Sequence, residues 1–293
     1  MPGAVRELAR SIRVGEALLM MGFPVAGAVY GLPNLSARVL GVAVVALAAM
    51  VPIALSVYAW NALGGLATDR RDPKFCRDPR LAGRVSPEWL QGVAWAGLVV
   101  GTGLGLVIAP WFAACLGALW FLWYLYSRPN GMKSVPGAGT AAHLVGGALM
   151  CLPPYMVVRP LDERGLFVAL ILCCAFAAGH AHHEIMDRRT DSAMNVRTGA
   201  VAWGARRAVW LGLAFACASY AAACVAAVTG ALSWWQAAPL VFAAPVHIGC
   251  GLRVLVSADV ERSNRLYQRR YRLIFGGAIA LSLVAAFVEL AIS

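Results

Sequence analysis

Long apolar runs, separated by short polar segments, occupy most of the chain. Because a helix rises about 1.5 Å per residue, each run is long enough to cross a hydrocarbon core about 30 Å thick. The pattern predicts one domain, residues 1–293, that folds as an all-α integral membrane protein with a bundle of nine transmembrane helices. The predicted segments are residues 14–32, 39–67, 89–109, 111–127, 138–158, 166–183, 200–229, 234–256 and 273–292.

The composition supports a membrane protein. The 293 residues are 60% hydrophobic and 13% charged, with a mean hydropathy of +0.69. A soluble chain of this length cannot bury so much apolar side chain, so the lipid bilayer is a predicted partner. The formal net charge of +11 would suggest a nucleic-acid partner in a soluble protein. Here the positive charge lies between apolar runs, where membrane orientation explains it, and no nucleic-acid binding is expected.

Basic residues are distributed unevenly between the two sides of the predicted bundle. Of the 25 Lys and Arg residues, only Arg38, Arg159 and Arg164 fall on the side opposite the N-terminus. Basic loops remain on the cytoplasmic side, so the N-terminus is predicted to be cytoplasmic. The loops after the second and sixth helices would then also be cytoplasmic. We expect a multi-pass protein of the cell membrane.

The first group of polar residues that could carry chemistry continues the sixth apolar run. His180, Glu184, Asp187 and Asp191 have the spacing i, i+4, i+7, i+11, so they share one face if the helix extends through them. Like charges on one face repel each other unless a cation or a basic ligand lies there. Oxygen ligands without cysteine favour a hard cation, and Mg²⁺ is usually held by a few carboxylates together with substrate phosphate.

Two other interpretations of this stretch stay open. The acids could form a solvated helix end that Arg188 and Arg189 neutralise. A zinc site is the second interpretation, with the ligands His180, His182, His183 and Glu184. The sequence HEIMD differs from the HEXXH pattern of zinc proteases, which argues against zinc.

A second polar group ends the second apolar run. Asn61, Gly65 and Asp69 have the spacing i, i+4, i+8, so Asn61 and Asp69 can face the same pocket as the acids of the sixth helix. Gly65 leaves room for a ligand or a neighbouring helix. Taken alone, Asn61 could instead form an interhelical hydrogen bond.

A third group, residues 124–133 (YLYSRPNGMK), ends the fourth run. Lys133 is a candidate contact for a diphosphate, and Tyr126 can donate a hydrogen bond. Arg197, after the second acidic stretch, also suits phosphate oxygens. The alternative for residues 124–133 is a basic anchor beside aromatic residues of the membrane interface.

Together these segments resemble the UbiA superfamily of intramembrane prenyltransferases. That family has nine helices and two aspartate-rich cytoplasmic motifs, roughly NDxxDxxxD after the second helix and DxxDxxxD after the sixth. The resemblance rests on residues 184–191 (EIMDRRTD), 196–198 (VRT), 126–133 (YSRPNGMK) and 83–86 (GRVS). It covers nearly the whole chain.

The first motif departs from the family pattern, because Ala62 and Gly65 stand where a typical member has aspartates. The reduced form NxxxGxxxD is similar to the terpene cyclase branch of the superfamily. The resemblance therefore implies a Mg²⁺-dependent cyclase that ionises farnesyl or geranylgeranyl diphosphate and cyclises the carbocation. The alternative is a prenyltransferase that moves the chain to an aromatic or quinone-precursor acceptor. A transporter or a silent scaffold is a third interpretation, less favoured because the acids cluster at one edge.

The resemblance also implies roles for individual residues, with Mg²⁺ as cofactor and no obligate protein partner. Four residues are expected to be catalytic, namely Asn61, Asp69, Asp187 and Asp191. These four and Glu184 are the expected metal ligands. The expected diphosphate contacts are Lys133, Arg77, Arg197 and Tyr126.

Overall fold

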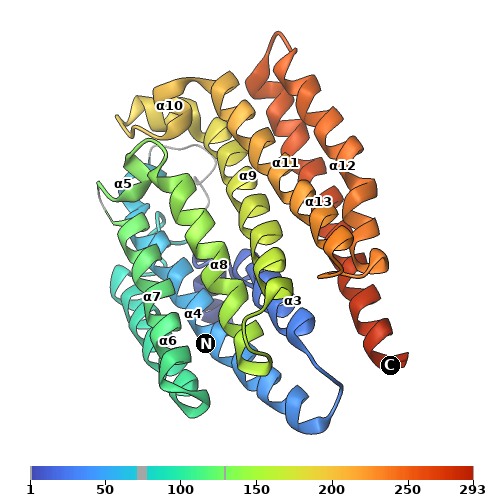
Figure 1. Ribbon diagram of the computed structural model, residues 1–293. Coiled ribbons are helices and arrows are strands. Elements are labelled where there is room, and N and C mark those ends of the chain that lie inside the picture. Colours follow the sequence, from blue (N-terminus) through green and yellow to red (C-terminus); the bar gives the residue numbers. More distant parts are fainter. Residues whose placement is uncertain (1, 71–77, 129, 293) are drawn as a thin grey trace.

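The computed structural model describes residues 2–70, 78–128 and 130–292, and every regular element in these ranges is a helix. Figure 1 shows the longer helices side by side in one bundle. The helices are α1 (Pro2–Ser11), α2 (Val14–Met20), α3 (Gly22–Gly31), α4 (Ala37–Gly64), α5 (Leu66–Asp69), α6 (Pro87–Ile108), α7 (Pro110–Ser127), η2 (Met132–Ser134), α8 (Ala138–Val158), α9 (Glu163–Ala193), α10 (Gly199–Trp203), α11 (Ala205–Thr229), α12 (Trp234–Leu255) and α13 (Val260–Ile292).

The helices agree with the predicted membrane class. Within the described residues, eight helical segments are long and apolar enough to cross a membrane. The predicted segment missing from these eight is the fourth, residues 111–127, which corresponds to α7 and its 18 residues. Its several tryptophans and tyrosines lower its hydropathy. The count of nine and the side on which the N-terminus lies therefore stay predictions, whereas the all-α bundle is confirmed.

Several predicted segments differ from the helices observed. The first is broken at Met21, where α2 ends and α3 begins. The second ends at Gly64, and α5 follows as a short separate turn. The last begins at Val260, well before residue 273. Its first turns bury Asn264, Tyr267 and Gln268 against the bundle, so they are helical although their sequence is polar.

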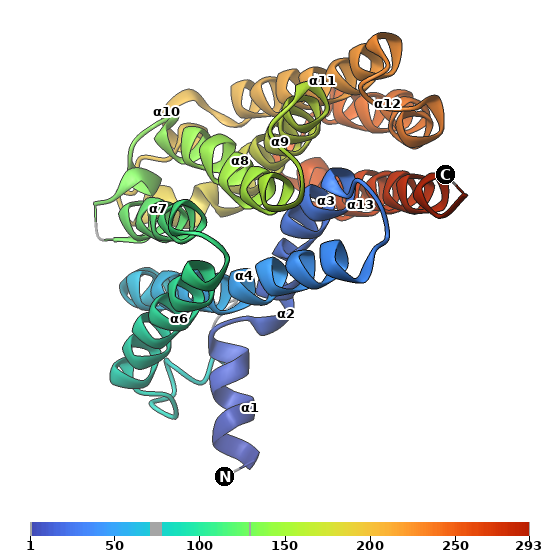
Figure 2. The same ribbon diagram turned by 60° about the horizontal axis from the view of Figure 1, so that its bottom comes forward.

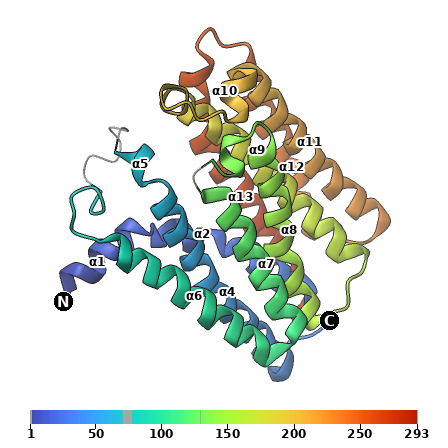
Figure 3. The same ribbon diagram turned by 90° about the vertical axis from the view of Figure 1, so that its left-hand side faces the viewer.

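The bundle has two sides joined by α8. Figures 1 and 3 show α4, α6 and α7 on one side and α9, α11 and α12 on the other. Helix α8 packs against both α7 and α9, and α3 packs against α8 and α9. Figure 2 shows α1 pointing away from the bundle, where Glu7 pairs with Arg84 at 2.8 Å.

Two helix crossings are so close that only glycine fits. A Cβ on Gly27 of α3 would collide with the carbonyl oxygen of Cys151 in α8. A Cβ on Gly64 would collide with the carbonyl oxygen of Ser127, where α4 meets the end of α7. Small residues at such crossings let membrane helices gain dispersion contacts between backbones. The second crossing fixes the end of the first polar motif against residues 126–133.

A buried polar cluster holds the other side together. The Nδ1–H of His182 on α9 donates to Asn264 Oδ1 at 2.7 Å, and Asn264 Nδ2 donates to the His182 carbonyl at 2.8 Å. Tyr220 and His247 join α11 to α12 through a 2.7 Å hydrogen bond. Such bonds between helices satisfy groups that would otherwise be buried without a partner. They fix α9 against α13 and α11 against α12.

The crossing at Gly27 generates a stability prediction. We expect Gly27→Ala to lower the unfolding free energy by about 2 kcal/mol or more, because the added methyl forces α3 away from α8. Gly22→Ala is the control in the same helix, since a Cβ added there would meet no heavy atom within 4 Å. It should be neutral or slightly stabilising. Thermal unfolding in detergent measures both, and equal melting temperatures would contradict the packing argument.

Candidate active site

The acids of the second motif lie on a continuous extension of α9. The helix begins after Asp162, whose side chain accepts a hydrogen bond from Gly165 N, and continues for 31 residues. It therefore passes through the polar stretch, as the shared-face prediction requires. His180, Glu184 and Asp191 are buried, and Asp187 is half-buried.

Glu184 is held from two directions. His180 Nε2 lies 3.1 Å from Glu184 Oε1. The backbone N–H of Ala200, in the first turn of α10, donates to Glu184 Oε2 at 3.1 Å. A Cβ on Gly199 would lie 2.8 Å from that oxygen, so glycine lets α10 approach. These bonds stabilise a buried carboxylate and fix its position at the edge of the bundle.

Arg188 and Arg189, which follow Asp187 in the sequence, form ion pairs with another helix. Arg188 Nη1 and Arg189 Nε lie 2.9 and 2.6 Å from the two carboxylate oxygens of Glu261 on α13. Arg188 Nε also donates to the Ala200 carbonyl at 3.1 Å. Both arginines therefore tie the end of α9 to α13 and α10. Arg197 is exposed in the loop between α9 and α10.

The zinc interpretation does not fit the side-chain positions. His182 turns toward Asn264, away from Glu184, and His183 lies 3.4 Å from Asp187. In the part of the chain that is described, no three His, Cys, Asp or Glu side chains converge as metal ligands. A Mg²⁺ ion does not demand such convergence, because it keeps several waters and takes one or two carboxylates together with phosphate oxygens.

The last residues of α7 and the short helix η2 lie next to the acids. Lys133, on the short helix η2, is within electrostatic reach of His180 and Glu184. Tyr126, near the end of α7, is within electrostatic reach of Glu184, Asp187 and Asp191. The fold thus brings two of the predicted diphosphate contacts together with the acids of α9.

A hydrogen bond to Asn61 connects the first motif to the end of α7. Ser127 Oγ donates to Asn61 Oδ1 at 3.4 Å, and Ser127 follows Tyr126 in sequence. Asn61 therefore forms an interhelical hydrogen bond and also lies beside the second motif. Arg77, the remaining predicted diphosphate contact, lies outside the described residues.

Arg80 organises the first motif, a role that no local sequence pattern predicts. Its side chain is 1% exposed. Arg80 Nη2 lies 2.8 Å from Asp69 Oδ2 and 2.7 Å from Asp78 Oδ2, and Nη1 donates to the carbonyl of Ala62 at 2.6 Å. The Ala62 carbonyl belongs to the last turn of α4, where carbonyls lack helical partners. One guanidinium thus links the end of α4, the end of α5 and the following loop.

Arg80, Asp69 and Asp78 form one small cluster of opposite charges. Partial burial raises the pKa of Asp78, but hydrogen bonds and the positive charge from Arg80 outweigh it, so this pKa lies below its ordinary value. Gly65 contributes by its small size, since a Cβ there would lie 3.1 Å from Asp69 Oδ2. An acidic side chain at this position would be forced against Asp69. Ala62 and Gly65, the two positions at which the first motif departs from the family pattern, therefore lie beside the ion pair between Asp69 and Arg80.

Aromatic rings lie next to the acids, on the side of the bundle interior. His143 of α8 stacks on His180, with ring centroids 3.7 Å apart and an interplanar angle of 15°. The rings of Trp123, Tyr126 and Phe176 lie 4.9, 5.4 and 4.6 Å from His143. His143 is not among the residues predicted from the sequence, and the one available signal was that it is the single histidine of an apolar run.

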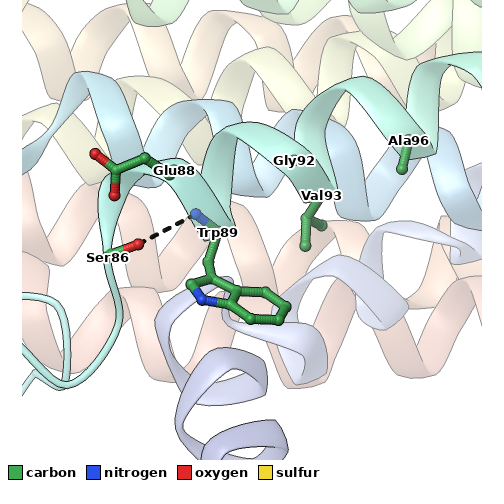
Figure 4. A pocket seen from close by; sticks show the side chains of 6 residues that line it. All are labelled: Ser86, Glu88, Trp89, Gly92, Val93 and Ala96. Atoms are coloured by element: carbon green, nitrogen blue, oxygen red, sulfur yellow. Dashed lines mark hydrogen bonds between the residues drawn. The ribbon is translucent and has the colours of Figure 1, made fainter.

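An open hollow lies apart from these residues, at the start of α6 (Figure 4). Ser86 caps this helix by accepting a hydrogen bond from Trp89 N at 3.4 Å. Trp89 is largely exposed, as expected of an aromatic side chain at a membrane interface. The hollow contains none of the predicted site residues. Its lining residues are Ser86, Glu88, Trp89, Gly92, Val93 and Ala96.

Comparison with known sequences identifies the chain. The profile of the UbiA prenyltransferase family matches residues 18–276. The chain belongs to the UbiA prenyltransferase family. No curated protein matches its sequence significantly. The family assignment agrees with the resemblance carried by the two acidic motifs.

Solved UbiA-like structures share the fold at low identity. A UbiA homologue from Archaeoglobus fulgidus bound to DMAPP and Mg²⁺ has a TM-score of 0.73 and 16% identity, covering 96% of this chain and 99% of that one. A structure of digeranylgeranylglyceryl phosphate synthase has a TM-score of 0.76 and 10% identity, with 97% and 99% coverage. An apo UbiA homologue from Aeropyrum pernix K1 has a TM-score of 0.70, 16% identity and 91% and 98% coverage.

The buried arginine of this UbiA-family protein yields a second stability prediction. Arg80→Met should lower the unfolding free energy by about 3 kcal/mol, because it leaves Asp69 and Asp78 without their shared cation. Arg84→Met is the control. Its guanidinium is 51% exposed and pairs with Glu7, so we expect a loss of less than about 1 kcal/mol.

The two variants should be compared by thermal unfolding in detergent without divalent metal. The control keeps the same change of side chain within the same loop. Equal melting temperatures for Arg80→Met and the unmodified protein would contradict an organising role for Arg80.

Proposed function

We propose that this UbiA-family protein is a Mg²⁺-dependent intramembrane terpene cyclase that acts on farnesyl or geranylgeranyl diphosphate. The observation that carries the proposal is the asymmetry of the two motifs. The α9 motif keeps three acids, whereas the α4 motif has Ala62 and Gly65 in place of aspartates and pairs Asp69 with Arg80. Such a reduced first motif argues against ordinary transfer to an acceptor.

The acids of α9 fit the diphosphate end of such a substrate. Mg²⁺, when bound, would neutralise the departing diphosphate and favour cleavage of the C–O bond. Asp187 and Asp191 would hold the ion, and Glu184, fixed by Ala200 N, would complete or orient this set. Asn61 and Asp69 would approach it from α4. The A. fulgidus homologue bound to DMAPP and Mg²⁺ supports the proposal that a prenyl diphosphate binds together with Mg²⁺.

Basic and polar groups would bind the diphosphate oxygens. Lys133 is close enough to Glu184 to act on the same ligand. Tyr126 can donate a hydrogen bond, and Arg197 can reach from the exposed loop after α9. We retain Arg77 in this set from the sequence alone. These cations would compensate the charge that develops on the leaving group.

The aromatic rings suit the other product of ionisation, a carbocation. Trp123, Tyr126 and Phe176 surround His143 and lie next to the acids of α9. The face of an aromatic ring attracts a cation, and an apolar site excludes water that would otherwise quench it. We place this chemistry in the cell membrane, with the acidic motifs on the cytoplasmic side, because the basic loops lie on that side.

Prenyl transfer to an aromatic or quinone-precursor acceptor is the second candidate. The match to the prenyltransferase family over residues 18–276 favours it. The two reactions share ionisation of the prenyl diphosphate and differ in what consumes the cation. A transferase needs an acceptor molecule, whereas a cyclase uses a double bond of the same chain.

An assay without acceptor separates these functions. Purified protein in lipid, supplied with farnesyl or geranylgeranyl diphosphate and Mg²⁺, should yield a cyclic hydrocarbon that gas chromatography with mass spectrometry detects. Chelation of Mg²⁺ should abolish the product. Product that forms only when an aromatic acceptor is added would overturn the cyclase and support the transferase.

The acids of α9 should be required in either case. Asp187→Ala and Asp191→Ala should each lower product formation at least about a hundredfold, because they remove ligands of the group that stabilises the leaving diphosphate. Glu163→Ala, an exposed acid at the opposite end of the same helix, is the control and should retain activity. Full activity in both aspartate variants would remove the site from α9.

A further inference from the structure

The protonation of His143 can be assigned from its hydrogen bond. Its Nδ1 lies 2.8 Å from the carbonyl oxygen of Gly139, one turn earlier in α8. A carbonyl oxygen only accepts, so Nδ1 carries the proton and donates it. In a neutral imidazole the other nitrogen then has a lone pair. His143 Nε2 is therefore a proton acceptor, and no other described residue donates a hydrogen bond to it.

The ring that carries this lone pair lies within a cluster of other aromatic rings. His143 is 9% exposed and is surrounded by the rings of Trp123, Tyr126, Phe176 and His180. The stacked His180 in turn bonds Glu184, so His143 lies one ring away from the acids.

The other groups of the site that could accept a proton are tied to the acidic motif. Both oxygens of Glu184 have partners, His180 Nε2 and Ala200 N. His180 also has a lone pair, on Nδ1, but its ring is held by the carboxylate of Glu184. His143 Nε2 belongs to a ring of the aromatic cluster that bonds only a backbone carbonyl.

We infer that His143 is the catalytic base that ends the carbocation sequence. This inference rests on the proposed cyclase function. Its Nε2 would remove a proton from a carbon adjacent to the cationic carbon, and the electron pair of that C–H bond would form a double bond. The C–O electron pair has already left with the diphosphate, so the products are a neutral hydrocarbon, diphosphate and an imidazolium ion. The imidazolium then returns its proton to the diphosphate or to water.

The molecule contains a matched control for this role. His182 of α9 has the same arrangement, since its Nδ1 bonds Asn264 Oδ1 at 2.7 Å and its Nε2 has no partner in the described chain. It is also fully buried. It belongs, however, to the polar cluster with α11 and α13, on the face of α9 away from Glu184. Its substitution tests the loss of a buried imidazole without loss of the proposed base.

The test measures two products of the same reaction. His143→Gln and His143→Phe should be incubated with farnesyl or geranylgeranyl diphosphate and Mg²⁺, and diphosphate release and hydrocarbons quantified in each sample. We expect the ratio of the normal hydrocarbon to released diphosphate to fall at least about tenfold, with alcohols or differently deprotonated hydrocarbons in its place. This ratio does not depend on the fraction of protein that folds. His182→Gln should leave it unchanged.

Three results would overturn the inference, and they are distinguishable. A wild-type protein that forms hydrocarbon, with an unchanged ratio and product profile in both His143 variants, removes His143 as the base and leaves the cyclase intact. A wild-type protein that forms no hydrocarbon without an acceptor removes the cyclase and this role together. A ratio that falls equally in His182→Gln would show a general packing effect and would also remove the role.

Discussion

Carboxylates at the edge of a hydrocarbon layer need a partner, because burying an unpaired charge costs more free energy than a membrane bundle can supply. The two motifs of this UbiA-family protein meet that need differently. Glu184 receives hydrogen bonds from His180 and from the first turn of α10. Asp69 receives a guanidinium, Arg80, that also binds Asp78 and the end of α4. These contacts fix α10 against α9, and Asp78 and Arg80 against the end of α4.

The difference between the two motifs bears on where a metal ion would bind. On the α4 side, the protein supplies its own cation, and Ala62 and Gly65 remove two of the charges that a metal would neutralise. On the α9 side, three acids share one helix face, and Arg188 and Arg189 turn away to Glu261. Under the proposed function, the metal ion would bind mainly on the α9 side. The asymmetry would then link the altered first motif to a substrate site formed mainly by the second.

Much of this arrangement could be predicted from the sequence, and the failures have physical causes. Helix α8 has the predicted bounds because a polar loop precedes its apolar run and a charged one follows it. The acids of α9 share a face because helical spacing alone determines this. In the sequence Arg80 is one of several basic loop residues, and nothing local reveals that it reaches back to Ala62. His143 lacks any motif, and only the packing of α8 on α9 places it beside His180.

The most informative failure concerns α13. A hydropathy pattern begins this helix at residue 273, because the preceding residues are polar and charged. Those residues are helical because the bundle gives them partners: Glu261 binds the two arginines of α9, and Asn264 bonds both the side chain and the carbonyl of His182. One face of α9 thus carries the proposed site while the opposite face is fastened to α13. Because a helix is stiff, the polar start of α13 contributes to where Glu184 and His180 stand relative to His143, so residues outside the proposed site help to set its geometry.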